Sequence, residues 1–165
     1  MDEEILNDCS ISDPELDVIA FRYFNPTGSH PSGLIGEDPR GTPNNIIPVV
    51  LQAFQRRRSK VQVFDSSYDT PDGTGIRDYI NVIDLARGHL AALRKLGNPT
   101  FIDPTVRRMS LVPNQLRPNY RCYNLGTGQG HSVLEILSAF GAVCGADIPF
   151  VISDARAGDL GSVTV

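Results

Sequence analysis

The stretch YNLGTGQGHSVLEIL, residues 123–137, constrains the fold more than any other, because an apolar run, a glycine-rich turn and a helical segment follow one another directly. Segments of the same two kinds alternate along most of the chain. Strands that alternate with helices are typical of α/β folds. The sequence therefore predicts an α/β protein.

The expected elements are short and are separated by turns rich in proline and glycine. Apolar, β-prone runs predict strands at residues 16–25, 61–64, 76–82, 120–125 and 148–153. Helical spacing predicts helices at 45–58, 84–96 and 132–145, and residues 3–8 resemble the end of another helix. Residues 26–44 are expected to form a long loop of the kind that often carries function. Residues 97–119 predict an irregular insertion in a single partial domain that spans 1–165.

The glycine turn allows two interpretations, a phosphate cradle for a dinucleotide or an ordinary turn between strand and helix. A dinucleotide fingerprint needs a third glycine where His131 stands and an acid at the end of the next strand, whereas Asp147 precedes that strand. Ser132 and Glu135 form a capping box, which explains by itself why a helix begins here. We therefore expect an ordinary turn that does not bind NAD.

Composition excludes several classes of function. A net charge of −4 argues against nucleic-acid and polybasic membrane partners. No apolar run is long enough to span a bilayer, and the first residues lack a secretory pattern. The three cysteines contain no CxxC pair, and the three histidines share no metal-ligand spacing. We expect a soluble cytoplasmic protein without a metal site.

Two long segments carry a specific resemblance. RYFNPTGSHPSGLIGEDPRGTPNNIIP and VFDSSYDTPDGTGIRDYINVIDLARGHLAAL closely resemble the UDP-glucose 4-epimerases (UDP-galactose 4-epimerases) of the extended short-chain dehydrogenase/reductase superfamily. The YNLGTGQGHSVLEIL stretch and the ARAGD near the end follow in the same order. Related sugar-nucleotide dehydratases and decarboxylases share RDY but usually not PNN and DGTG together. The resemblance covers the chain except residues 97–119.

The resemblance implies an enzyme that moves a hydride from C4 of a UDP-hexose to tightly bound NAD and returns it to the other face of a 4-keto intermediate. In fold it implies the C-terminal portion of a Rossmann-type epimerase. Strands at 16–23 and 120–125 would belong to the nucleotide-binding sheet, and the remainder would form the smaller lobe that binds UDP-sugars. The family is usually homodimeric.

The catalytic base of such enzymes is a tyrosine with a lysine four residues later, and none of the five tyrosines here has one. By resemblance the chain begins just after that motif, so we expect the C-terminal half of an epimerase, with no catalytic residue and no NAD binding of its own. Exposed strand edges should favour aggregation or a partner. A non-catalytic protein that binds UDP-sugars or a partner, and a truncated gene product, remain alternatives.

The resemblance assigns the sugar and diphosphate contacts. Asn25 would hydrogen-bond the sugar nucleotide, and Phe24 would lie against the nicotinamide end of NAD. Asn45 and Ile46 would present a helix N-terminus to the diphosphate, with Asn45 also capping that helix. Arg77 would hold the diphosphate from another side.

The remaining assignments concern the uridine end. Gln62, Val63 and Phe64 would line the uracil. Arg156 would join Arg77 in clamping the diphosphate, and Asp159 would fix the ribose hydroxyls.

Other charged residues are expected to serve structure alone. Residues 55–60, QRRRSK, should be a solvated helix end. Asp78, next to Arg77, should have a structural role, and Asp84 should cap the helix that follows.

Overall fold

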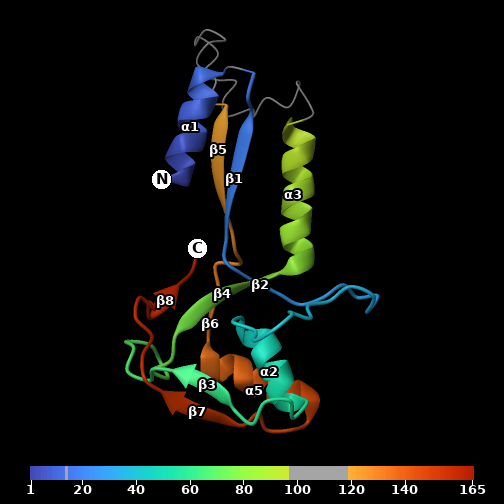
Figure 1. The fold of residues 1–165 in the computed structure, drawn as a ribbon, viewed down its shortest axis with the longest axis vertical. Coiled ribbons are helices and arrows are strands. Elements are labelled where there is room, and N and C mark those ends of the chain that lie inside the picture. The colour runs from blue at the N-terminus through green and yellow to red at the C-terminus, as the bar shows by residue number, and fades with distance from the viewer. Residues whose placement is uncertain (14, 97–118) are drawn as a thin grey trace. The chain divides into compact units, whose positions relative to one another are not determined.

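The computed structural model describes residues 1–13, 15–96 and 119–165, which form two compact units. The first unit contains residues 1–23 and 84–125, and the second contains 24–83 and 126–165 (Figure 1). The insertion expected at 97–119 lies, except for its last residue, outside the described residues. None of the helices in these ranges combines the length and apolar character that crossing a bilayer requires.

The first unit is built on two parallel strands. β1 (Val18–Tyr23) pairs with β5 (Tyr120–Leu125), and Val18 lies opposite Tyr120. The helices of this unit are α1 (Asp2–Ser12) and α3 (Val82–Leu96). The parallel pairing confirms the expected α/β class.

Alternation along the strands places the two helices on opposite faces of this small sheet. Arg22 of β1 donates from Nε to Oε1 of Glu3 in α1 at 2.6 Å. The adjacent residue, Phe21, faces α3, where its ring lies 5.0 Å from the ring of His89. In Figure 1, β1 and β5 accordingly run between α1 and α3.

The first unit buries little apolar surface among its described residues. All of the described apolar side chains that are fully buried belong to the second unit. In the first unit Ile5, Leu90 and Leu93 remain 54%, 53% and 63% exposed. Parallel strands are normally covered on both faces and paired on both sides, so such exposure among the described residues of this unit is unusual.

The second unit holds the remaining strands in two sheets. Its elements are β2 (Asn25–Thr27), α2 (Ile46–Phe54), β3 (Val61–Phe64), β4 (Ile76–Asn81), β6 (Gly130–Ser132), α5 (Val133–Cys144), β7 (Phe150–Ser153) and β8 (Ser162–Val163). β4 pairs in parallel with β2 and β8 and antiparallel with β6. β3 and β7 form a separate parallel pair. The sequence did not predict β6 and β8, which are two or three residues long.

The core of the second unit lies between α2, β3 and α5. Its buried members are Val50, Ala53, Val61, Val63, Leu137 and Ile148. Val50 and Ala53 come from the helix that apolar spacing predicted, and Val61 and Val63 alternate along β3 with more exposed residues. This core fixes the start of α2 and the outer face of β3, which both reach the site described below.

Several expected boundaries were wrong, and the structure gives a reason for two of them. The strand predicted at 16–25 is divided at Phe24 into β1 and β2, which belong to different units. α3 begins at Val82 rather than after Asp84, because Oδ1 of Asn81 accepts a hydrogen bond from the Ile83 amide at 2.8 Å. Asp84 lies inside the first turn and pairs with Arg87 instead of capping the helix.

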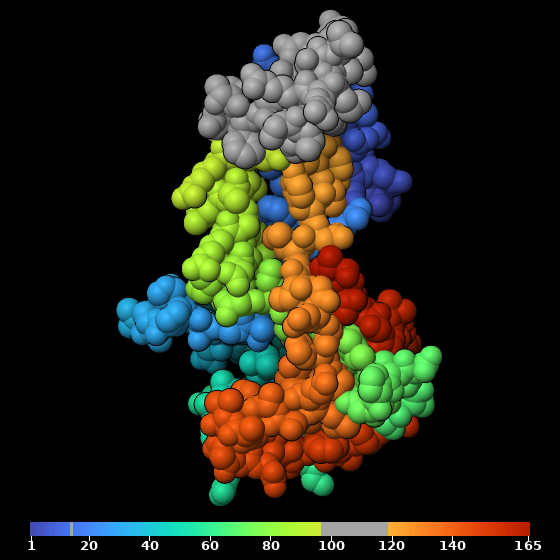
Figure 2. All heavy atoms as spheres, turned by 180° about the vertical axis from the view of Figure 1, so that it is seen from behind, coloured from blue at the N-terminus to red at the C-terminus, as the bar shows by residue number. Residues whose placement is uncertain are grey.

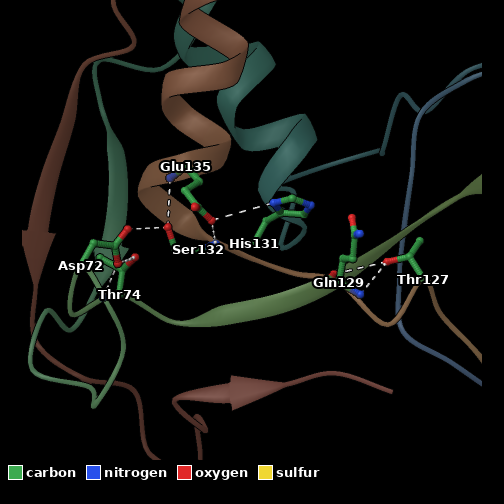
Figure 3. A network of polar contacts seen from close by, with 7 residues as sticks. All are labelled: Asp72, Thr74, Thr127, Gln129, His131, Ser132 and Glu135. Carbon is green, nitrogen blue, oxygen red and sulfur yellow. Dashed lines mark hydrogen bonds and ion pairs between the residues drawn. The ribbon is translucent and has the colours of Figure 1, made fainter.

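The capping box at the start of α5 is confirmed. Oγ of Ser132 accepts from the Glu135 amide at 3.0 Å, and Oε2 of Glu135 accepts from the Ser132 amide at 2.8 Å. Ser132 also donates to Oδ2 of Asp72, so the cap joins the loop before β4 to this helix (Figure 3). One buried hydroxyl therefore organises two segments that are distant in sequence.

Replacing this hydroxyl should destabilise the protein. Ser132→Ala removes both the cap and one hydrogen-bond donor to Asp72, and loss of an N-cap alone costs about 0.5–2 kcal/mol. Urea denaturation should show a lower unfolding midpoint for Ser132→Ala than for Ser138→Ala, because Ser138 is an exposed residue within the same helix. Equal midpoints for the two variants would contradict the role of Ser132.

Candidate functional site

A cavity of about 270 Å³ in the second unit brings together residues from distant parts of the chain. Every residue that the resemblance assigned to substrate lines it: Asn25, Asn45, Ile46, Gln62, Val63, Phe64, Arg77, Arg156 and Asp159. Thr42, Pro43, Asn44, Val49, Arg58, Tyr68, Gly75, Tyr79 and Val133 complete the lining. Their convergence is a property of the fold, whereas binding of a ligand by them stays a prediction.

β4 supplies the cation at one side of the cavity. Arg77 and Tyr79 alternate toward the cavity, while Asp78 and Ile80 are buried on the other face of the strand. Nη1 of Arg77 donates to the carbonyl of Ile76 at 2.8 Å. The guanidinium packs beside Gly75, where a Cβ would lie 3.4 Å from Nη1.

The N-terminus of α2 opens into the same cavity. Asn45 is the N-cap residue of this helix, as expected, and has an extended backbone, but its side chain makes no cap hydrogen bond. Its Nδ2 donates instead to Oε1 of Glu37 at 3.4 Å. The first amides of α2 are therefore not capped by this side chain, and the cavity has backbone donors at a helix N-terminus.

Arg156 contacts two other residues that the resemblance assigned to the uridine end, Asp159 and Phe64. Arg156 donates from Nε and Nη2 to Oδ2 of Asp159, at 2.9 Å and 2.7 Å. The Arg156 guanidinium carbon lies 4.3 Å from the ring centroid of Phe64. Stacking and ion pairing fix the direction of the guanidinium plane. Arg156 thus already has a carboxylate partner within the protein.

The loop before β4 forms another wall of the cavity. Asp72 accepts from the amide of Thr74 at 2.9 Å as well as from Ser132 (Figure 3). Gly73 has φ +78° and approaches the carbonyl of Ser66 so closely that a Cβ would collide with it. Figure 2 shows this loop, residues 65–75 in light green, beside the red C-terminal segment, where Tyr68 packs on Gly161.

Asp78 holds the glycine turn that follows β5. Its Oδ1 accepts from the amide and the hydroxyl of Thr127 at 2.9 Å and 2.7 Å, and its Oδ2 accepts from the Gly128 amide at 2.9 Å. A Cβ at Gly126 would lie 2.5 Å from Oδ2, so glycine is needed for the carboxylate to approach. Asp78 is structural, as expected, but its partners are in this turn.

The same contacts decide how well the turn fits NAD. Its amides at Thr127 and Gly128 already donate to a carboxylate, whereas a phosphate cradle needs amides that face the ligand. His131, at the place of the third fingerprint glycine, lies in β6 opposite Arg77. These residues do not fit a dinucleotide pyrophosphate, and we derive no step through NAD from them.

Some assignments were missed or stay separate from the cavity. Arg58 was expected to be solvated, yet it lines the cavity, so that expectation was wrong. Tyr79 could have been found from its alternation with Arg77, whereas Arg58 gave no periodic signal. Phe24, predicted to contact NAD, is half-buried and is not among the lining residues that the structure describes. Within the described ranges no group of three potential metal ligands occurs, and Cys9, Cys122 and Cys144 are free thiols.

The sequence and the fold define the class of protein. The chain belongs to the NAD dependent epimerase/dehydratase family, whose pattern matches residues 3–102. More specifically, the chain is 43% identical over 160 residues to a UDP-glucose 4-epimerase of Yersinia pestis and 46% identical over 158 residues to one of Bacillus subtilis.

Solved structures show the same relationship. A UDP-glucose 4-epimerase from Bifidobacterium longum, solved in complex with NAD⁺ and UDP, is 42% identical and superposes with a TM-score of 0.81. The match covers 97% of this chain and 42% of that structure. Coverage of the curated relatives is similar, at 97% and 96% of this chain but 42% and 41% of theirs. The chain therefore spans less than half the length of the proteins it resembles.

The environment of Asp78 predicts a pH dependence of stability. Burial alone would raise the pKa of Asp78, but hydrogen bonds from Thr127 and Gly128 outweigh it and leave this pKa below its ordinary value. A carboxyl with a depressed pKa stabilises the fold above its unfolded pKa of about 3.9 and loses that contribution as pH falls through the lower folded value.

We expect Asp78→Asn to be less stable than the wild type at pH 7 and to lose less stability on acidification. Thermal unfolding from pH 7 to pH 3 measures both effects. Asp69→Asn, at an exposed position, should follow the wild-type profile. If the stability of Asp78→Asn also followed the wild-type dependence on pH, the charge of the Asp78 carboxylate would not be what anchors the turn.

Proposed function

We propose that this chain binds UDP-hexoses and provides the substrate-binding part of UDP-glucose 4-epimerase activity, the interconversion of UDP-glucose and UDP-galactose. The observation that carries the proposal is that all nine residues assigned to substrate line one cavity. Solved relatives support it: one was crystallised with NAD⁺ and UDP, and another with NAD and formylated UDP-arabinopyranose.

The parts of the cavity match the parts of a UDP-sugar. The Arg77 guanidinium and the amides at the start of α2 suit the diphosphate, because both offer donors to phosphate oxygens. Both arginine contacts of Asp159 are made by Oδ2, so Oδ1 can accept a ribose hydroxyl. The amide of Asn25, at the start of β2, can donate to and accept from the hexose hydroxyls.

The chemistry requires more than this cavity. When bound, NAD supplies the acceptor for the C4 hydride, and a general base must take the proton from the 4-hydroxyl. None of the five tyrosines of this chain is followed by lysine at the fourth position. We therefore assign to these residues the binding and orientation of the nucleotide sugar, and no proton transfer.

A non-catalytic UDP-sugar-binding protein is the second candidate, because the proposed substrate cavity lies wholly within the second unit. A cytoplasmic location is also part of the proposal. We also propose that the chain self-associates or aggregates through the first unit, because β1 and β5 pair only with each other among the described strands.

The diphosphate contact predicts the effect of one substitution. Arg77→Ala should weaken UDP binding by about 1.5–3 kcal/mol, the usual contribution of a hydrogen bond to a charged group. Isothermal titration calorimetry with UDP measures the change. Arg87→Ala, whose side chain is 74% exposed in the first unit, should leave the affinity unchanged. Equal UDP affinity of Arg77→Ala and the wild type would remove Arg77 from the site.

The missing base predicts the absence of turnover by the 165-residue chain. A coupled assay that detects UDP-glucose formed from UDP-galactose should give the uncatalysed background, even with NAD⁺ added. Calorimetry should likewise show no saturable binding of NAD⁺. Turnover that is proportional to protein concentration and is retained through repurification would mean that a catalytic base lies elsewhere in the chain. NAD⁺ binding that is abolished by Gly128→Val would mean that the glycine turn binds the cofactor.

A further inference from the structure

The segment between β7 and β8, residues 154–161, carries two of the residues that line the cavity, Arg156 and Asp159. This β7–β8 linker contains no helix or strand, and apart from Asp159 and Gly161 its residues are exposed. The ion pair between Arg156 and Asp159 joins the two side chains to each other but does not fix the linker on the rest of the unit. The position of the pair therefore depends on the contacts that the linker makes with other elements, such as the stacking of Arg156 on Phe64.

Gly161 anchors the end of the β7–β8 linker. Its carbonyl accepts a hydrogen bond from the amide of Ile76 in β4 at 2.8 Å. Its backbone packs against the ring of Tyr68: beyond the adjacent residues, the three heavy atoms nearest to a Cβ at position 161 would all belong to Tyr68, with Cδ1 only 3.1 Å away. Gly161 does not have the left-handed φ that favours glycine. A side chain here would therefore be costly because it would overpack the contact with Tyr68.

Tyr68 is itself held in place by the loop before β4. Its amide donates to the carbonyl of Gly73 at 3.1 Å, and its carbonyl accepts from the amide of Thr70 at 2.8 Å. The same loop is tied to the start of α5 through Asp72 and Ser132. Figure 2 shows the loop beside the C-terminal segment that contains the linker. The ring therefore belongs to a fixed part of the second unit, against which the linker can be held.

We propose that Tyr68 is a positioning residue for the nucleotide sugar. Its ring, packed on Gly161, keeps the β7–β8 linker where Arg156 and Asp159 reach the cavity. The proposal rests on UDP-sugar binding by this cavity, and it assigns to Tyr68 an effect that passes through the Arg156–Asp159 pair rather than a contact of its hydroxyl with the ligand.

Calorimetric titration of the full chain with UDP tests this role. Tyr68→Ala should weaken UDP binding by about fivefold or more, a factor usual for residues that are coupled by direct contact. Tyr68→Phe keeps the ring and should stay within about twofold of the wild type. Gly161→Ala should also weaken UDP binding, because the added Cβ displaces the ring or the linker.

A second background separates positioning from a general loosening of the fold. In a chain that carries both Arg156→Ala and Asp159→Ala, adding Tyr68→Ala should change the UDP affinity by no more than about twofold, because the side chains that Tyr68 places are already gone. A general loosening would cost the same factor in this background as in the wild type.

Thermal unfolding tests the contact itself. Gly161→Ala should lower the unfolding midpoint in the wild-type background but not in Tyr68→Ala, where the ring that the new Cβ would meet is absent. Gly158→Ala is the matched control in the same linker. Gly158 has φ +84°, and a Cβ there would have no heavy atom within 4 Å, so its replacement is costly because of the backbone alone. Gly158→Ala should lower the midpoint in both backgrounds.

The remaining outcomes contradict the proposal in different ways. If Tyr68→Phe weakens UDP binding as much as Tyr68→Ala does, the hydroxyl contacts the ligand and the proposal is wrong. If Tyr68→Ala binds UDP like the wild type, or costs the same factor in both backgrounds, the proposal is wrong although the proposed function stands. If Tyr68→Ala does not fold, wild-type UDP affinity of Gly161→Ala overturns the proposal instead. If the wild type does not bind UDP, the proposed function fails and this proposal fails with it.

Discussion

The carboxylate of Asp78 is the contact on which the second unit depends most. It is fully buried, at 0% exposure, and it accepts hydrogen bonds from a turn about fifty residues later in the chain. Because β4 alternates, fixing Asp78 on one face also fixes Arg77 on the other face, toward the cavity. A buried carboxylate is costly unless its oxygens are satisfied, so the glycine turn and the strand constrain each other. The turn that resembles a cofactor motif thus orders the strand that carries Arg77 to the cavity.

Local patterns predicted the fold where neighbouring residues decide the outcome. The capping box at Ser132 and the apolar spacing of α2 follow from such short-range rules, and both appear in the structure. The start of α3 did not follow, because Asn81 offered an earlier cap than Asp84. The division of the first predicted strand at Phe24 could not be predicted either, because local sequence patterns do not indicate to which unit a residue belongs.

The candidate site could be predicted only where motifs were available. Residues such as Asn25 and Asp159 were assigned by resemblance, and the structure adds that they line one cavity. Arg58 could not be assigned in this way, because its place depends on the left-handed backbone at Arg56. The sequence also did not predict the ion pair between Arg156 and Asp159, because the resemblance assigned the two residues to different parts of a ligand and not to each other.

The chain passes between the two units three times, near residues 23, 83 and 125, so neither unit is a continuous segment. β1 and β5 are neighbours in one sheet, with Val18 opposite Tyr120, yet most of a second unit is encoded between them. During synthesis β1 must therefore wait for its partner until that intervening segment has left the ribosome, while the second unit waits in turn for residues 126–165. Pairing at such long sequence separation slows folding. Until β5 has been made, the edge of β1 with which it will pair stays open, so the risk of wrong pairing depends on this delay rather than on the final strength of the contacts between β1 and β5.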